Sequence, residues 1–226
     1  MNAARLVQQD SGQVEWYTPS PIIEAARAVM GDIDLDPASS EAANETVRAY
    51  RFYTRADDGL TQPFYGRLWV NPPFSDVARF VNRLMAEYEA KRVREACIIT
   101  FASLDTEWAR KLAAFPRWYP EGRVAYIPGW EATAATQATL PGLADAATVD
   151  LRAVAGTADA PPKASMVTYV GPDDGALSFA ETFTRRLGGW VDVPWDLHRR
   201  EQQRQLREYL GGLGKQEVRH YGAPEF

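Results

Sequence analysis

Residues 67–74 read Arg-Leu-Trp-Val-Asn-Pro-Pro-Phe, and they contain the end of one element and the beginning of the next. Its first half, Arg67 to Val70, is an apolar run that predicts a strand. The two prolines end that strand, because proline has no backbone N–H to donate to a sheet. Residues 76–92 then carry apolar side chains at helical spacing. A strand that leads through a short turn into a helix is the repeating unit of an α/β protein.

The same alternation continues in both directions along the chain. Ser20 is expected to cap a helix that has Pro21 in its first turn, and Ser39 or Ser40 is expected to cap the next helix. These patterns predict an α/β fold with a mostly parallel sheet and helices on both of its faces. Helices are expected at residues 22–30, 41–50, 104–115, 179–187 and 197–210, and strands at residues 32–36, 51–54, 96–101, 123–127 and 165–170.

The length of 226 residues fits one domain with appendages. Residues 1–14 are polar and are expected to form a flexible N-terminus, residues 15–190 the main domain, and residues 191–226 a C-terminal helical tail. Residues 130–162 are rich in Ala, Thr and Gly and are too long for a simple connection in a compact domain. This segment is predicted to be either a long functional loop or a small insertion, with target recognition as one role open to it.

The charge of the chain gives two opposing indications. A net charge of -5 argues mildly against a nucleic-acid partner, because phosphate binding depends on Lys and Arg. The basic residues are clustered, however, and each cluster is either a phosphate-binding surface or a solvated helix face balanced by nearby glutamates. The clusters are Arg79, Arg83, Lys91, Arg92 and Arg94; Arg185 and Arg186; and Arg199, Arg200, Arg204 and Arg207.

Several classes of protein are disfavoured by what the chain contains. Cys97 is its single cysteine, so no internal disulfide can form, and its apolar neighbours indicate a small core residue. Two histidines and one cysteine give no ligand cluster, and no metal site is predicted. Neither a signal peptide nor an apolar run of membrane-spanning length is found, so we expect a cytoplasmic protein without a membrane partner. The oligomeric state is left open.

The chemistry of the chain is predicted to reside at Asn71-Pro72-Pro73-Phe74. This turn follows a strand at the carboxyl end, where ligands bind in open parallel sheets. The side-chain oxygen of Asn71 and the carbonyl of Pro72 can both point at one target as acceptors, and an amino group with two N–H bonds is the natural target. Phe74 offers a flat face to an aromatic base. The alternative is that the two prolines only terminate the strand.

Two acceptors on an amino group would help it to accept a methyl group. An aromatic amine is a poor nucleophile, because its lone pair is delocalised into the ring. Acceptors that hold its two hydrogens favour a pyramidal nitrogen and stabilise the positive charge that develops there. With S-adenosylmethionine as the methyl donor, the protein contributes mainly positioning. A base inside a duplex would have to flip out to reach such a turn.

Four ordered blocks of the sequence resemble the phage-type (Dam-like) DNA N6-adenine methyltransferase family. The resemblance covers roughly residues 15–171, and four blocks in order are far more specific than any one of them. The blocks are Trp16-Tyr17-Thr18-Pro19, residues 34–39, Asp58-Gly59-Leu60 and residues 69–74, and they are continued by residues 105–108 and 122–124.

The resemblance implies a Rossmann-like fold that uses S-adenosylmethionine, with double-stranded DNA as the partner and a bacterial or phage-infected cell as the setting. It also implies roles for particular residues. Asp36, Pro37 and Ala38 would form a loop near the methionine part of the cofactor, and Asp58 would lie near its adenine. The residues bordering the cofactor would further include Trp16, Tyr17, Thr18 and Pro19, and the catalytic residues would be Asn71, Pro72, Pro73 and Phe74.

Two departures from the family pattern keep other functions open. The loop after Asp36 has no glycine, although methyltransferases commonly place glycines there so that the backbone can approach the cofactor. Phe74 stands where tyrosine is commoner. A catalytically inactive methyltransferase-like protein that binds DNA or a host protein is therefore one alternative. A second is an amino-methyltransferase acting on RNA or on a protein glutamine.

Several of these residues also have simpler interpretations as ordinary parts of a fold. Trp16 and Tyr17 could be core anchors, and Asp34 is interpreted as a solvated acid at a strand edge. The two acids of the Asp57-Asp58-Gly59 turn are common turn residues.

Overall fold

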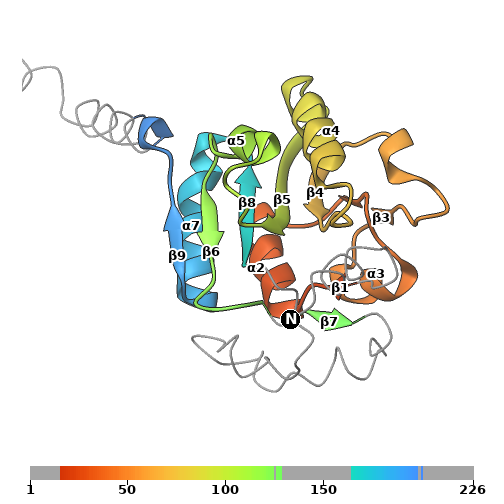
Figure 1. The fold of residues 1–226 in the computed structure, drawn as a ribbon, viewed down its shortest axis with the longest axis horizontal. Helices are drawn as coiled ribbons and strands as arrows, with labels where there is room; N and C mark the ends of the chain where they lie inside the picture. The colour runs from red at the N-terminus through yellow and green to blue at the C-terminus, as the bar shows by residue number, and fades with distance from the viewer. Residues whose placement is uncertain (1–15, 125, 129–163, 198–199, 201–226) are drawn as a thin grey trace, which may run out of the picture.

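The computed structural model describes residues 16–124, 126–128, 164–197 and 200. In this part of the chain, seven strands form one sheet in the order β3-β2-β4-β5-β8-β6-β9 (Figure 1). A separate two-stranded ribbon pairs β1 (Trp16–Tyr17) with β7 (Ile127–Pro128). The strands of the sheet are β2 (Leu35–Asp36), β3 (Arg51–Phe52), β4 (Gly66–Val70), β5 (Val93–Phe101), β6 (Arg117–Tyr119), β8 (Ser165–Val170) and β9 (Trp190–Asp192).

The sheet is mixed, so the expectation of a mostly parallel sheet needs correction. Strands β3, β2, β4 and β5 pair in parallel, whereas β8 pairs antiparallel with both β5 and β6, and β9 pairs antiparallel with β6. The alternation of strands and helices does not reveal this, because it cannot show that β8 inserts, reversed, between two strands that run the same way. The parallel half is the part that contains the Asn-Pro-Pro-Phe turn.

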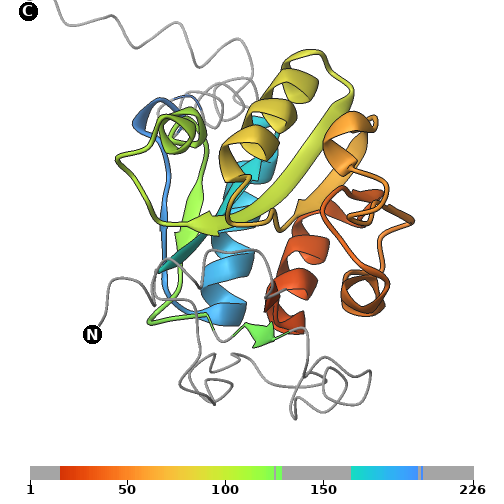
Figure 2. The ribbon, with the colours of Figure 1, turned by 45° about the vertical axis from the view of Figure 1, so that its right-hand side comes forward.

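Helices cover both faces of the sheet, as expected (Figure 2). Successive side chains of a strand point to opposite faces, so Trp69 lies in one core and its neighbours Leu68 and Val70 lie in the other. Helices α2 (Ser20–Met30) and α7 (Asp173–Leu187) pack on the Trp69 face, where α3 (Glu41–Val47) adds Val47, while α4 (Val77–Glu89) and α5 (Glu107–Leu112) pack on the opposite face.

The helix starts follow the sequence signals in part. Ser40 caps α3 by accepting a hydrogen bond from the Ala43 N–H at 3.1 Å, as predicted. The expected cap of α2 was wrong: the helix begins at Ser20 itself, and Pro19 takes the N-cap position without a side-chain bond. Helix α7 begins at Asp173, earlier than expected, directly after Gly171-Pro172.

Some expected segments are only partly described. Of the strand expected at 123–127, the structure has only β7, and strands β1, β6 and β9 were not predicted. Residues 1–14 and 130–162, and most of the helix expected at 197–210, lie outside the described residues. Strand β9 carries the main sheet as far as Asp192.

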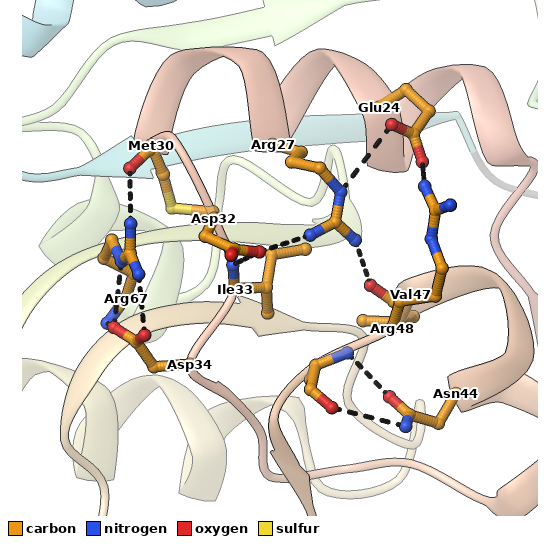
Figure 3. Close-up of polar contacts among 11 residues, drawn as sticks. Glu24, Arg27, Met30, Asp32, Ile33, Asp34, Asn44, Val47, Arg48 and Arg67 are labelled. Carbon is orange, nitrogen blue, oxygen red and sulfur yellow. Dashed lines mark hydrogen bonds and ion pairs between the residues drawn. The ribbon is translucent and has the colours of Figure 1, made fainter.

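An ion pair fixes β2 against β4 at the end of the sheet remote from the turn (Figure 3). Asp34 accepts hydrogen bonds from the Arg67 backbone N–H at 2.8 Å, from its Nε at 2.9 Å and from its Nη2 at 2.8 Å. Gly66 has a φ of 73°, and a Cβ there would lie 2.5 Å from Asp34 Oδ2, so glycine makes room for the carboxylate. Asp34 is therefore an anchor between two strands, and its interpretation as a solvated edge acid was wrong.

Neighbouring contacts attach α2 and α3 to the same end of the sheet (Figure 3). Arg27 of α2 bonds to Asp32 at 2.6 Å and to the carbonyl of Val47 in α3. Arg48 pairs with Glu24 across the surface. These bonds hold the segments that lead into β2 and β3 against helix α2.

We predict that Arg67→Met lowers the free energy of unfolding by about 1–3 kcal/mol, because it leaves a part-buried carboxylate without its main partner. Arg48→Met is the matched control, since the Arg48 side chain is 61% exposed and an exposed ion pair contributes under about 1 kcal/mol. Urea unfolding of both variants measures the difference. Equal losses of unfolding free energy in the two variants would show that Arg67 does not stabilise the Asp34 carboxylate more than an exposed ion pair would.

Candidate functional site

A cavity of about 350 Å³ lies at the carboxyl ends of β3, β2 and β4. The chain order reverses here, because β2 lies between β3 and β4, and ligands of open α/β sheets bind at such a position. The volume falls within the usual range of small-molecule sites. The register Leu35↔Leu68 brings the residues that follow β2 beside those that follow β4.

The cavity brings together nearly all of the site residues predicted from the sequence. Pro19 is the exception, since it lies buried at the start of α2 and not in the cavity wall. The predicted residues that line the cavity are Trp16, Tyr17, Thr18, Asp36, Pro37, Ala38, Asp58, Asn71, Pro72, Pro73 and Phe74.

Asn71 is oriented by a main-chain carbonyl. Its Nδ2 donates a hydrogen bond to the carbonyl oxygen of Trp16 at 2.9 Å. Because a carbonyl can only accept, the nitrogen of the amide must face Trp16, and Oδ1 must face away from it. No residue in the described part of the chain donates a hydrogen bond to Oδ1.

The two prolines differ in what their carbonyls do. The Pro73 carbonyl accepts the Asp76 N–H at 2.9 Å, which closes the turn. Within the described ranges, no donor reaches the carbonyl of Pro72. Asn71 Oδ1 and the Pro72 carbonyl thus keep their acceptor capacity, on a turn that the prolines make rigid.

Phe74 has an aromatic backing that the sequence did not reveal. Its ring lies 4.1 Å from that of Phe101, centroid to centroid, and meets the ring of Tyr126 edge-on at 6.4 Å. Tyr126 is buried, its hydroxyl lies 3.0 Å from Ser165 Oγ, and burial raises its pKa well above the usual value. Phe101 could have been found as the last residue of the apolar run 96–101. Tyr126 gave no such signal.

Asp36 is a buried carboxyl group in the cavity wall, only 2% exposed, at the end of β2. Burial raises its pKa to about 7, although hydrogen bonds from the Ala38 N–H, at 3.1 Å, and from Ser39 act in the opposite direction. A buried acid with a strongly raised pKa in a cavity is a candidate for ligand binding. A cationic ligand group beside it would stabilise the ionised form.

The N-terminal block contributes an unused hydroxyl. Thr18 Oγ1 is buried in the cavity wall and has no hydrogen-bond partner among the residues that the structure describes. The block is also tied to α3, because Ser40 Oγ donates to the Tyr17 hydroxyl at 3.0 Å. A buried polar atom without a partner is costly, and a ligand would supply the missing bond.

Gly59 packs tightly against the loop after Asp36. A Cβ at position 59 would lie 1.9 Å from the Pro37 carbonyl oxygen, so only glycine fits against that loop. Asp58 precedes it in a left-handed conformation, with a φ of 47°. Asp57 is a turn residue, whose carboxylate accepts from the Thr54 N–H at 2.8 Å. Gly59 thus allows two loops of the cavity wall to pack closely against each other.

Most described members of the basic clusters are paired with acids. Arg79 pairs with Asp76, Arg83 and Arg92 with Glu87, Arg94 with Glu95, Arg185 with Glu181, and Arg200 with Asp196. These contacts favour the interpretation of these residues as solvated surface groups balanced by nearby acids. Arg199, Arg204 and Arg207 lie outside the described residues.

Within the described ranges, no group of three or more His, Cys, Asp or Glu side chains could hold a metal ion. None of the helices described is both long enough and apolar enough to cross a membrane.

The structure is a mixed α/β fold, consistent with an α/β methyltransferase, and it has a cavity over parallel strand ends with an Asn-Pro-Pro-Phe turn in its wall. Comparison with known families shows the family to which the chain belongs. The sequence model of the DNA N-6-adenine-methyltransferase (Dam) family matches residues 7–144, more than half of the chain, and the chain belongs to this family. The resemblance inferred from the four blocks is thereby confirmed. No individual curated protein and no solved structure gave a significant match.

We predict that Asp36→Asn changes how stability depends on pH. The folded-state pKa of Asp36, about 7, lies above its ordinary value of 3.8, so its stabilisation is complete below the ordinary value and is lost as the pH rises toward 7. Relative to Asp36→Asn, the ligand-free wild-type protein should therefore lose unfolding free energy between about pH 5 and pH 7, and the difference should level off above pH 7. Urea unfolding at several pH values measures this.

Asp34→Asn is the control for this experiment. Hydrogen bonds from Arg67 lower the pKa of Asp34, so its stabilisation is present above the ordinary pKa and is lost only as the pH falls further. The difference in unfolding free energy between Asp34→Asn and wild type should stay constant over the same pH range. A constant difference between Asp36→Asn and wild type as well would contradict the prediction.

Proposed function

We propose that the protein transfers a methyl group from S-adenosylmethionine to the N6 amine of adenine in double-stranded DNA. The observation that carries this proposal is the pair of acceptors, Asn71 Oδ1 and the Pro72 carbonyl, in the wall of a cavity that also contains the buried Asp36. Membership of the DNA N-6-adenine-methyltransferase family supports it. We also infer that the parallel strands form the Rossmann-like half of the sheet.

The residues of the cavity fit S-adenosylmethionine. Asp36 would accept hydrogen bonds from its cationic amino group, which would compensate for burying the carboxylate. Thr18 Oγ1 is a polar atom that still needs a partner. Tyr53, Leu60 and Phe80 add apolar surface suited to a nucleoside. When bound, the cofactor supplies a methyl group on a sulfonium.

Asn71 and Pro72 would act on the adenine amine. Each acceptor takes one N–H, which directs the nitrogen lone pair toward the methyl group and stabilises the positive charge that builds up as the N–CH3 bond forms. Neither an amide nor a peptide carbonyl is a base, so the proton that the amine gives up leaves to water. Phe74, held from behind by Phe101, would offer one rigid face to the flipped base.

The alternatives are weaker on these observations. The inactive, DNA- or host-binding protein was suggested by a loop without glycine, but the cavity beside that loop contains the buried Asp36 and the unpartnered Thr18 hydroxyl, which suit a polar, cationic cofactor. The family membership favours DNA over RNA or a protein glutamine. We place the reaction in the cytoplasm of a bacterial or phage-infected cell, where its DNA substrate is found.

We predict that DNA incubated with the protein and S-adenosylmethionine gains N6-methyladenine. Mass spectrometry of the digested nucleosides measures the product. N4-Methylcytosine as the single modified nucleoside would overturn the assignment to adenine, and the absence of any methylated nucleoside, together with no cofactor binding, would favour the inactive protein.

Asn71→Ala should slow methyl transfer by on the order of a hundredfold or more and leave cofactor affinity nearly unchanged, because it removes one acceptor from the amine. Asp36→Asn should mainly weaken cofactor binding, with a smaller effect on the rate of methyl transfer. Phe74→Ala should weaken capture of the base by about 1–3 kcal/mol. Single-turnover rates and calorimetry with S-adenosylmethionine separate these effects. If Asn71→Ala methylates at the wild-type rate, the catalytic role of Asn71 is wrong.

A further inference from the structure

The ribbon of β1 and β7 contacts the Asn-Pro-Pro-Phe turn through a main-chain group. It pairs Trp16 with Pro128 and Tyr17 with Ile127, apart from the main sheet (Figure 1). Its Trp16 carbonyl accepts the hydrogen bond from Asn71 Nδ2 at 2.9 Å. The ribbon thus reaches the one side chain that the proposed reaction requires as an acceptor.

Trp16 is held in place from several directions. Its side chain packs against the core beneath α2 and α7. The next residue, Tyr17, accepts the hydrogen bond from Ser40 at the start of α3, and two residues further on the Pro19 carbonyl accepts the Ile22 N–H at 3.1 Å. A carbonyl fixed in this way is a preorganised acceptor for Asn71.

The orientation of the Asn71 amide matters because its two ends have opposite functions. With Nδ2 toward Trp16, Oδ1 remains to accept an N–H from an amine. If the amide turned over, its NH2 group would face the NH2 group of the amine, and Oδ1 would face the Trp16 carbonyl, acceptor against acceptor. The bond to Trp16 therefore selects the productive orientation before any substrate arrives.

We propose that the Trp16 carbonyl is a positioning group for the Asn71 amide, and that it makes position 71 of this chain specific for an amide over a carboxylate. The kinetic part of this inference rests on the proposed methyl transfer to adenine. An aspartate at position 71 would still have two acceptor oxygens for the amine. When ionised, however, it has no hydrogen to donate to Trp16, and one of its oxygens would face the carbonyl.

Asn71→Asp tests the inference through its dependence on pH. Single-turnover methylation is measured with saturating S-adenosylmethionine and DNA from about pH 5.5 to pH 9, and each rate is divided by the wild-type rate at the same pH. At pH 8 the ratio should be on the order of a hundredth or less. It should rise as the pH falls, because a protonated carboxyl can donate to Trp16. Asn71→Ala, which cannot donate at any pH, should give a flat ratio.

Two outcomes would overturn the inference. The first is an Asn71→Asp rate equal to wild type at pH 8, since the bond to Trp16 would then be unnecessary. The second is a low ratio at every pH, parallel to that of Asn71→Ala, in a protein that melts and binds cofactor as wild type does.

A second measurement uses the wild-type protein alone, so it holds whether or not the variant folds and whether or not the proposed function is right. In the ¹⁵N NMR spectrum, one side-chain NH2 proton of Asn71 should be shifted downfield and should exchange slowly with water. Asn82 is the control, because it is exposed and its Oδ1 accepts a bond from Lys111 Nζ at 2.6 Å. Exchange at Asn71 as fast as at Asn82 would overturn the positioning role.

Discussion

The parallel pairing of β2 with β4 is the constraint on which the rest of the site depends. It is fixed at one end by Asp34 and Arg67, with Gly66 leaving space for the carboxylate. At the other end, Asp36 at the end of β2 and Asn71 directly after β4 both line the cavity. Two residues that are far apart in the chain therefore face one cavity, and the polar contacts that achieve this lie outside it. The ion pair that holds the two strands together and the cavity with its polar residues therefore lie at opposite ends of the same strand pair.

The cavity combines groups that are unfavourable in an empty protein. A nearly buried carboxyl at Asp36, an unpartnered hydroxyl at Thr18 and a left-handed backbone at Asp58 each cost stability on their own. Their concentration in one wall supports the proposal that this cavity binds a polar, cationic ligand. The hydrophobic cores on both faces of the sheet offset the free-energy cost of these groups.

Much of the site could be predicted from the sequence, because it depends on local signals. The apolar run that ends in Asn-Pro-Pro-Phe predicts both the strand and its end, and Ser40 is recognisable as a helix cap. Contributions from main-chain groups and distant segments could not be read in the same way. The carbonyl of Trp16 has no side-chain signature, and Gly59 supports Pro37 only because two loops meet in space.

The misread parts of the fold have a related cause. Strands β6 and β9 have three residues each, which is too short for an alternating pattern to be detected. The direction of β8 is a property of the whole topology, since an apolar run reads the same whether its neighbours are parallel or antiparallel. Local pattern thus locates strands but does not orient them.

The reversed insertion of β8 has a consequence for the growing chain on the ribosome. Strand β5 is almost wholly buried, and β8 covers one of its edges along six residues. That edge stays open from the time β5 emerges until Ser165–Val170 has been synthesised, whatever β6 does in the meantime. An uncovered apolar edge can recruit strands from other chains. This edge of β5 is therefore open to pairing with other chains during this interval of translation.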